Sequence, residues 1–407
     1  MDTIAEDYIA QEEALGAHYY SPLPIVLRKA KGVWVEDTEG NLYLDFMSAY
    51  SALSLGHSHP RIVAALQDQL QTLAMCSRAF YHDQLLPFYQ KLIDLTGLAK
   101  VLPANTGVEA VEAAIKAARR YGYKVKKIPP NQAEIIVAKN NFHGRTTGVI
   151  SFSSSDLYKE DFGPLMPGFV TVPFGDAAAL ESAITARTCA FLVEPIQGEA
   201  GIIVPPEGYL KAVRAICDKH GIALIFDEIQ TGLGRTGEWF ACQHEDVMPD
   251  GIILGKALGG GVLPVSALVG THALMDVFTL GSHGSTFGGN PLAMRVACEA
   301  LAIIEEEGLV ARSKALGKTL VSELNKIDSP FIQEVRGKGL LVALELGDTG
   351  LTGREFCMEL LKVGVLTKNV HGNIIRLAPP LVIQEEDLYI TVEKIAQTLK
   401  HLESRRS

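Results

Sequence analysis

Residues 189–228, CAFLVEPIQGEAGIIVPPEGYLKAVRAICDKHGIALIFDE, contain two apolar runs separated by an amphipathic stretch. The runs at 189–195 and 221–228 are rich in Ile, Val, Leu and Phe and show little alternation, which is typical of strands covered on both faces. Between them, residues 209–221 place apolar side chains at helical spacing and end on Gly221, a common helix stop. The stretch therefore predicts a strand–helix–strand unit.

The same alternation continues on both sides of this unit. Residues 133–140, 250–256 and 265–270 are further short apolar runs that predict strands. Residues 108–123 form the clearest helical pattern, with one apolar stripe and Arg and Lys near the end. Strands that alternate with helices in this way predict an α/β fold built on a mostly parallel sheet.

The two ends of the chain differ from this middle part. Residues 31–47 alternate apolar and polar side chains around DTEGN, which predicts a hairpin, and helical patterns after about residue 300 precede a strand pair at 333–346. We therefore expect a large α/β domain at 51–299. A smaller α+β domain would combine residues 1–50 with residues 300–407.

Composition excludes several classes of protein. The 407 residues include 37 Lys and Arg against 47 Asp and Glu, so the net charge of −10 disfavours a nucleic-acid binder. The chain has no run of about 18 apolar residues, as a membrane span requires. Its first residues are acidic and match neither a signal peptide nor a transit peptide, so we expect a soluble, cytoplasmic protein.

The cysteines and histidines do not predict a metal site. The six cysteines are scattered, none in a C-x-x-C pair, so we expect small buried hydrophobic side chains rather than zinc ligands or disulfides. The histidine couple His57 and His59 precedes a proline and has no acidic neighbour in sequence, which indicates a turn. We expect no metal.

Three polar residues stand where predicted strands end. Glu194, Asp227 and Lys256 each follow a buried apolar run, and ligands of open parallel sheets bind beyond these carboxyl ends. A desolvated lysine has a lowered pKa and attacks carbonyl groups to form a Schiff base. An aspartate on a neighbouring strand can pair with a pyridinium nitrogen. Together they indicate pyridoxal 5'-phosphate (PLP) as cofactor.

The phosphate of such a cofactor needs a helix N-terminus. Residues 103–110, PANTGVEA, lead into the strongest predicted helix, so the backbone N–H groups of Gly107 and Val108 would face an anion. Phe142, which follows a predicted strand, offers an aromatic face for a pyridine ring.

A competing motif is the G-x-G-x-x-G run at 232–237, which follows a strand and is formally that of a nicotinamide dehydrogenase. Five residues separate the strand from the glycines, no clean amphipathic helix follows, and no ribose-binding acid stands about 20 residues later. The context therefore speaks against dinucleotide binding.

Longer motifs resemble one family from end to end. They are VEPIQGEAG (193–201), FDEIQTGLGRTG (226–237), LGKALGGG (254–261), HGSTFGGNPL (283–292) and HGNIIRLAPPLVI (371–383). The chain is similar to the class III PLP-dependent aminotransferases of fold type I, and within them to the ornithine aminotransferase group. The resemblance implies a large domain with a mostly parallel seven-stranded sheet between helices, and PLP as cofactor.

The resemblance also implies roles in cofactor binding. Lys256 would hold PLP covalently and move the proton between substrate and cofactor, while Asp227 would keep the pyridine nitrogen protonated and Gln230 would contact the ring oxygen. Ser285 and Thr286 would reach the phosphate from a second subunit, which implies a homodimer. The further cofactor-binding residues are Phe142, Gly107 and Val108.

For the substrates, the resemblance implies transfer of the δ-amino group of L-ornithine to 2-oxoglutarate. Glu199 would pair with Arg376 and mask it while ornithine binds. Arg145 would hold the α-carboxylate of ornithine, with Tyr20 at its polar end and Tyr50 lining the same pocket. With 2-oxoglutarate, Arg376 would bind the α-carboxylate and Arg145 the distal one, since Arg reads carboxylates bidentately.

Alternatives remain open at this point. His143 in FHGRT matches acetylornithine aminotransferases, whereas Tyr20 and the EAG motif favour free ornithine; 4-aminobutyrate and lysine are further candidate substrates. A scaffold without turnover is a third reading. A protein that had lost catalysis would have no physical reason to retain Lys256, Asp227 and Arg145 together.

Overall fold

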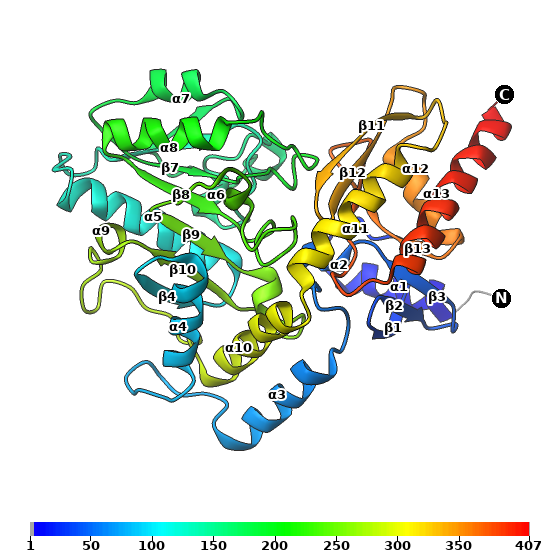
Figure 1. The fold of residues 1–407 in the computed structure, drawn as a ribbon, viewed down its shortest axis with the longest axis horizontal. Coiled ribbons are helices and arrows are strands. Elements are labelled where there is room, and N and C mark those ends of the chain that lie inside the picture. The colour runs from blue at the N-terminus through cyan, green and yellow to red at the C-terminus, as the bar shows by residue number, and fades with distance from the viewer. Residues whose placement is uncertain (1–3, 407) are drawn as a thin grey trace.

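The computed structural model describes residues 4–406. A seven-stranded sheet lies at its centre, in the order β4-β10-β9-β8-β7-β5-β6 (Figure 1). All neighbours pair in parallel except β10, which is antiparallel to both β4 and β9. The predicted mostly parallel seven-stranded sheet is thus confirmed. The strands are β4 Lys100–Ala104, β5 Glu134–Ala138, β6 Phe169–Val172, β7 Thr188–Val193, β8 Ala223–Asp227, β9 Gly251–Leu254 and β10 Ser266–Gly270.

Helices cover both faces of this sheet, which explains the apolar runs without alternation. All six residues of β7 are buried. On one face the Ala-rich stripe of α5 (Gly107–Lys124) packs against Ile135, Leu192 and Ile225. On the other face Phe191 and Phe226 pack against α7 (Ala177–Ala183) and α8 (Tyr209–His220). Along most of each strand, neighbouring side chains therefore belong to different apolar clusters, one on each face of the sheet.

The remaining helices surround the sheet or lead away from it. Short 3-10 helices of three to five residues are η1 Asp156–Tyr158, η2 Ala241–Glu245 and η3 Lys256–Gly259. The other helices are α1 Ile4–Leu15, α2 Ser48–Ser51, α3 Pro60–Thr72, α4 Leu85–Thr96, α6 Thr147–Ile150, α9 His272–Met275, α10 Pro291–Glu306, α11 Leu309–Leu324, α12 Gly353–Lys362 and α13 Glu385–Arg406. No helix within residues 4–406 is long and apolar enough to span a bilayer.

Two smaller sheets combine the two ends of the chain. In the first, the predicted hairpin β2–β3 joins β13, which pairs in parallel with β3 although more than 300 residues separate them. The second has the order β11-β12-β15-β14 and contains the predicted pair β11–β12. Figure 1 shows the N-terminal strands beside the C-terminal elements. The strands are β1 Leu27–Lys31, β2 Trp34–Asp37, β3 Leu42–Asp45, β11 Ile332–Lys338, β12 Leu341–Leu346, β13 Val365–Leu366, β14 Lys368–Val370 and β15 Ile374–Leu377.

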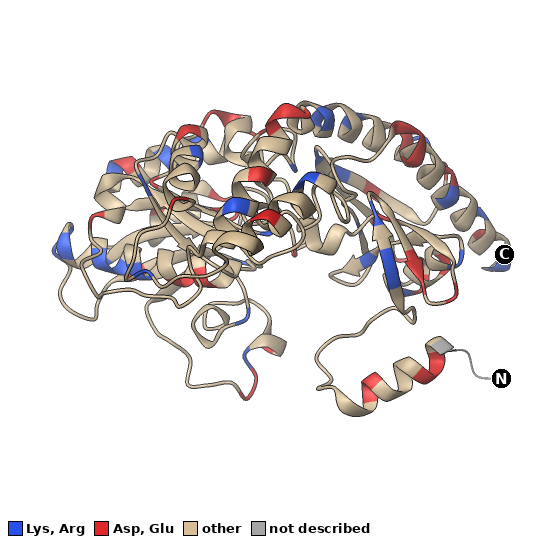
Figure 2. Ribbon diagram, turned by 90° about the horizontal axis from the view of Figure 1, so that it is seen from below, with Lys and Arg blue, Asp and Glu red and all other residues tan. Residues whose placement is uncertain are grey.

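Helix α1 lies to one side of these small sheets and joins them through an extended segment (Figure 2). The same view shows Lys and Arg mixed with Asp and Glu along the outer helices. The extended segment carries Tyr19 and Tyr20, which are both exposed. It therefore brings two aromatic side chains from the N-terminus towards the centre of the molecule.

The glycine run at 232–237 connects the central sheet with the small sheets. Its Arg235 is fully buried and donates to the carbonyl oxygens of Leu340 and Pro379 at 3.0 and 2.6 Å, and to Ser54 Oγ at 2.9 Å. A single 3-10 turn, η2, follows the run in place of a long helix. The run is thus a structural turn and not a dinucleotide-binding loop.

The histidine prediction needs one correction. His57 Nε2 lies 2.8 Å from Asp45 Oδ2, and His59 Nε2 lies 3.4 Å from Glu307 Oε1, so both have acidic partners. These partners come from distant parts of the chain, which is why the local sequence did not indicate them. The six cysteines are free as predicted, five of them buried and Cys76 partly buried. Among the described residues no cluster of His, Cys, Asp and Glu could hold a metal ion.

Candidate active site

The carboxyl ends of three neighbouring parallel strands meet at one cavity of about 180 Å³. Glu194 follows β7, Asp227 ends β8 and Lys256 follows β9, and all three side chains line the cavity. The order of the strands in the sheet, β9-β8-β7, places Asp227 between the other two. The structure thus brings together the residues that the sequence places at strand ends.

Lys256 is prepared to act as a nucleophile. Its removal from bulk water lowers its pKa to about 8, although Glu199 and Asp227 favour the charged form. The backbone of Lys256 is left-handed, with φ of +44°, a conformation that costs energy for a residue with a Cβ. A lysine with a lowered pKa has a larger neutral fraction near neutral pH, and the neutral amine is the form that attacks a carbonyl.

Asp227 has a buried histidine partner. Its Oδ2 lies 2.7 Å from His143 Nδ1, and its Oδ1 accepts the backbone N–H of Ile229 at 3.1 Å. Burial opposes protonation of His143, but the hydrogen bond and the charge of Asp227, helped by Glu194, raise the pKa of the imidazole. The sequence analysis singled out His143 only as a difference between groups of relatives. In the structure it orients the carboxylate that faces the cavity.

The carboxylate of Glu194 forms hydrogen bonds with two different segments at the cavity. Its carboxylate accepts the backbone N–H of Phe142 at 3.0 Å and that of Gly198 at 3.3 Å. Burial raises the pKa of Glu194 to about 7, against the opposing charge of His143. Phe142 lines this cavity and the larger one beside it.

The start of α5 forms an anion cradle in the same cavity. Glu109 caps the helix by accepting the backbone N–H groups of Asn105 and Thr106 at 3.0 and 2.6 Å. Gly107 and Val108 line the cavity at the N-terminus of the helix, where backbone N–H groups and the helix dipole favour an anion. A Cβ added at Gly107 would lie 2.9 Å from Ile229 Cδ1, so this wall accepts only glycine without rearrangement.

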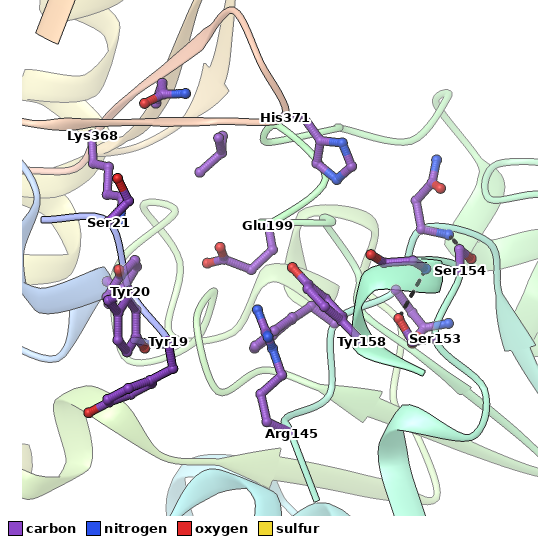
Figure 3. A pocket seen from close by; sticks show the side chains of 17 residues that line it. Tyr19, Tyr20, Ser21, Arg145, Ser153, Ser154, Tyr158, Glu199, Lys368 and His371 are labelled. Carbon is purple, nitrogen blue, oxygen red and sulfur yellow. Dashed lines mark hydrogen bonds between the residues drawn. The ribbon is translucent and has the colours of Figure 1, made fainter. Parts of the chain in front are cut away.

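A second cavity of about 500 Å³ adjoins the first and shares Phe142 and Glu199 with it (Figure 3). Tyr20, Tyr50 and Arg145 line it, as the sequence analysis predicts for a substrate pocket. Tyr50 stands on a left-handed turn with φ of +61°. Further lining residues that the sequence analysis did not identify are Tyr19, Ser153, Ser154, Tyr158, Lys368 and His371.

Arg376 lies behind this cavity and is almost completely buried. Its Nη2 is 2.7 Å from Glu199 Oε1, which also accepts the side-chain amide of Gln230 at 3.0 Å. Burial raises the pKa of Glu199, but the charges of Arg376 and Lys256 outweigh it, so the net shift is downward. Within residues 4–406, Nε and Nη1 of Arg376 are buried without a hydrogen-bond partner. These donors suit a carboxylate ligand, since burying an unpaired donor is costly.

Ser285 and Thr286 do not line either cavity of their own chain. They line a separate hollow of about 430 Å³ with Arg78, and Ser285 Oγ accepts a hydrogen bond from the side chain of Asn105 at 3.2 Å. Their predicted contact with a cofactor of a second subunit stays a prediction.

The first cavity fits PLP in its chemistry. A lysine amine stands opposite a helix N-terminus, a carboxylate held by a histidine faces the space between them, and an aromatic side chain lines it. Gln230 Oε1 is buried without a partner among the described residues. Each group of the cofactor, namely aldehyde, phosphate and pyridine ring, has a matching protein group here.

Known proteins agree with this assignment. The chain is 54% identical over 400 residues to the ornithine aminotransferase of Halalkalibacterium halodurans, covering 98% of this chain and 100% of the relative. A structure of the ornithine aminotransferase from Toxoplasma gondii, with PLP in partial occupancy at its active site, superimposes with a TM-score of 0.97 at 42% identity, covering 99% and 95%. An acetylornithine aminotransferase structure from Elizabethkingia anophelis has a TM-score of 0.90 and 51% identity, covering 98% and 99%.

Residues 15–399 match the family described as aminotransferase class-III. The match spans almost the whole chain and both cavities, and the seven-stranded sheet is that of fold type I. On these grounds, the chain belongs to the class-III aminotransferases and uses PLP.

Proposed function

We propose that the protein transfers the δ-amino group of L-ornithine to 2-oxoglutarate. The products are L-glutamate 5-semialdehyde, which cyclises to pyrroline-5-carboxylate, and L-glutamate. The relatives named ornithine aminotransferase at 54% identity support this substrate pair. The reaction places the enzyme in arginine and proline metabolism, and we propose a cytoplasmic location for it.

The observation that carries the proposal is the ion pair between Glu199 and Arg376. A buried guanidinium beside the reactive lysine would bind the α-carboxylate of any α-amino acid and present its α-amine. Because Glu199 occupies Arg376 at 2.7 Å, we assign the carboxylate of ornithine to Arg145 in the larger cavity, which Lys368 also lines. Ornithine held there by its α-carboxylate extends its δ-amine towards Lys256.

When bound, PLP supplies an electron-withdrawing ring that accepts the electron pair released when the substrate carbon loses a proton. Lys256 Nζ, whose pKa is lowered to about 8, would take that proton from Cδ of ornithine and hold it for return. Asp227, held by His143, would face the ring nitrogen of the cofactor and favour its protonated form. The backbone N–H groups of Gly107 and Val108 would hold the phosphate.

In the second half-reaction the dicarboxylate 2-oxoglutarate needs two cations. Glu199 swings away and releases Arg376, whose unpaired Nε and Nη1 then bind the α-carboxylate. Arg145 binds the distal carboxylate. Tyr20 and Tyr50 line the space between these two positions and contact the substrate carbon chain.

The proposal includes a homodimer and two domains. Ser285 and Thr286 lie outside the chain's own cofactor cavity and line a hollow with Arg78. Large exposed side chains follow these residues in sequence, namely Phe80 and Tyr81 after Arg78, and Phe287 after Thr286. These features support a shared active site. The large domain comprises residues 51–299. Residues 1–50 and 300–407 form the small domain, and the β3–β13 pairing that joins them supports this division.

The visible absorbance of the PLP-loaded protein tests the substrate. L-Ornithine or N-acetyl-L-ornithine is added in separate cuvettes without a keto acid, and loss of the cofactor band is followed. Bleaching with free ornithine, and slow or no bleaching with the acetylated amine, supports the proposal. The opposite preference would make the protein an acetylornithine aminotransferase, like its relative at 51% identity.

A further inference from the structure

We propose that Tyr158 is a positioning residue that orients Arg145 and so determines how strongly the enzyme selects substrates with a carboxylate at the far end. The inference rests on the proposed function and deepens it. Tyr158 is the last residue of the 3-10 turn η1 and lines the larger cavity.

The contact between the two side chains is close. The guanidinium carbon of Arg145 lies 3.5 Å from the centre of the Tyr158 ring, with the two side chains together in the cavity wall (Figure 3). The Phe142 ring is a second, more distant neighbour, at 5.4 Å from the same carbon. The rings of Phe142 and Tyr158 meet edge to face, with centroids 6.4 Å apart. Two aromatic side chains therefore form a corner that receives the guanidinium.

Arg145 has no other restraint of comparable strength. It is exposed, and within residues 4–406 no carboxylate lies within ion-pair distance of it. An Arg side chain is long and loses much conformational freedom when it binds a ligand. Stacking on Tyr158 removes part of this freedom before the substrate arrives, which favours binding.

The mode of contact matters as much as its strength. A cation–π contact uses the face of the guanidinium, whereas its N–H donors lie in the plane. Tyr158 thus restrains Arg145 without neutralising it or occupying its donors. Glu199 does the reverse at Arg376, where a carboxylate occupies the cation. The two arginines of the site are therefore held in opposite ways, one available and one masked.

The position of Tyr158 is itself well defined. Its backbone N–H donates to Ser155 O at 3.2 Å, and the N–H groups of Lys159 and Glu160 both donate to Asp156 O at 2.9 Å. These bonds close a compact turn at the cavity wall. The turn therefore fixes the point at which the Tyr158 side chain leaves the backbone, and the contact with Phe142 supports the ring.

The test compares substrates with and without the carboxylate. Values of kcat and KM are measured for the PLP-loaded wild type, Tyr158→Leu, Tyr158→Phe, Arg145→Ala and the Tyr158→Leu/Arg145→Ala double variant. The substrates are L-ornithine and 1,4-diaminobutane, which is ornithine without its carboxylate. Tyr158→Leu should lower kcat/KM for ornithine by about 2-fold to 30-fold, mainly through KM. The loss of kcat/KM for 1,4-diaminobutane should be clearly smaller, because this substrate has no carboxylate for Arg145 to bind.

Two matched comparisons separate positioning from a structural role. Tyr158→Phe keeps the aromatic ring, so its kcat/KM for ornithine should lie within about 2-fold of the wild-type value. The double variant should be no worse than Arg145→Ala alone, because Tyr158 acts through Arg145. Equal losses on both substrates, or losses that multiply in the double variant, would overturn the inference.

Binding of glutarate, a dicarboxylate with neither amine nor keto group, provides a readout without turnover. Calorimetric titration of the PLP-loaded protein should show the same 2-fold to 30-fold weakening for Tyr158→Leu. If the wild type does not turn over ornithine but glutarate binding depends on Tyr158, the proposed function fails and this inference stands. If ornithine is turned over and Tyr158→Leu alters neither measurement, only this inference fails.

Discussion

The carboxylate of Glu199 lies 2.7 Å from the guanidinium of Arg376, in the wall between the two cavities. The same oxygen accepts the amide of Gln230 at 3.0 Å, so one side chain connects the cofactor cavity with the buried arginine. The ion pair thus occupies one nitrogen of a buried arginine whose Nε and Nη1 have no hydrogen-bond partner among residues 4–406.

Removal of Glu199 should therefore change which amine reacts. In Glu199→Ala, Arg376 is free to bind α-carboxylates, so the rate with L-alanine as amino donor should rise at least 10-fold relative to L-ornithine, a difference of about 1.4 kcal/mol. Initial rates with both donors provide the measurement. Glu199→Gln serves as control, because it keeps the shape but not the charge and should show the same direction. An unchanged ratio in both variants would refute the masking of Arg376.

Lys256 should be indispensable. In Lys256→Ala the amine that moves the substrate proton is absent, so turnover should fall by more than about 1,000-fold, and the visible band of covalently held PLP should be lost. Coupled assays and absorbance spectra check these two results. Lys256→Arg keeps a cation at the same place but cannot attack a carbonyl at neutral pH, and should be equally inactive. Appreciable turnover in either variant would contradict the assignment.

The lowered pKa of Lys256 predicts a pH dependence of stability for the protein without PLP. The folded-state pKa is about 8 and the ordinary value is 10.5, so between these pH values the unfolded state binds more protons. The free energy of unfolding should then rise as the pH increases from about 8 towards 10.5. Urea unfolding of wild type and Lys256→Met at pH 7, 8.5 and 9.5 isolates the effect. The advantage of the Met variant at pH 7 should shrink at higher pH, and a constant difference would contradict the shift.

A side chain at Gly198 should displace Gln230. A Cβ at this position would lie 1.5 Å from Gln230 Oε1, so Gly198→Ala must displace Gln230 and break its hydrogen bond to Glu199. We expect weaker PLP binding and at least a 10-fold fall in kcat. The double variant Gly198→Ala/Gln230→Ala removes the clash and should recover thermal stability but not activity. If Gly198→Ala alone had wild-type kinetics, the close approach would have no functional importance.

Arg235 should be important for stability rather than chemistry. It is fully buried and donates to Leu340 O, Pro379 O and Ser54 Oγ. Arg235→Met leaves these acceptors without a donor and should lower the free energy of unfolding by about 2–5 kcal/mol. Urea denaturation measures the loss. Arg235→Lys retains a cation that cannot reach all three acceptors, so an intermediate value is expected; no loss in either variant would contradict the role.

Sequence reasoning reached the local elements because their causes are local. The unalternating run at β7 follows from burial on both faces, and the apolar stripe of α5 follows from helical periodicity. The strand-end positions of Asp227 and Lys256 could be read from the same runs. Their convergence was predictable, because parallel strands end at one edge of a sheet.

Other features could not be predicted from local sequence patterns. The partners of His57 and His59 come from remote segments, so the short sequence around them contains no sign of either acid. His143 stood out only as a difference between relatives, and its contact with Asp227 joins residues 84 positions apart. Tyr158 lies in a polar segment without hydrophobic periodicity, so no pattern predicted its contact with Arg145. The presence of an aromatic residue in this polar segment, shortly after FHGRT, is the signal that could have identified it as a candidate.

Local sequence patterns were enough to predict the α/β class, the mostly parallel sheet and the strand-end residues, because the hydrophobic period and the ends of helices and strands depend on near neighbours. The long motifs of the chain determined the family. The family resemblance predicted that Glu199 pairs with Arg376, and the structure shows this contact, whereas the contacts of His143 with Asp227 and of Tyr158 with Arg145 became visible only in the folded chain. Each of these contacts joins side chains from separate segments of the chain, and their distances depend on how the whole chain packs.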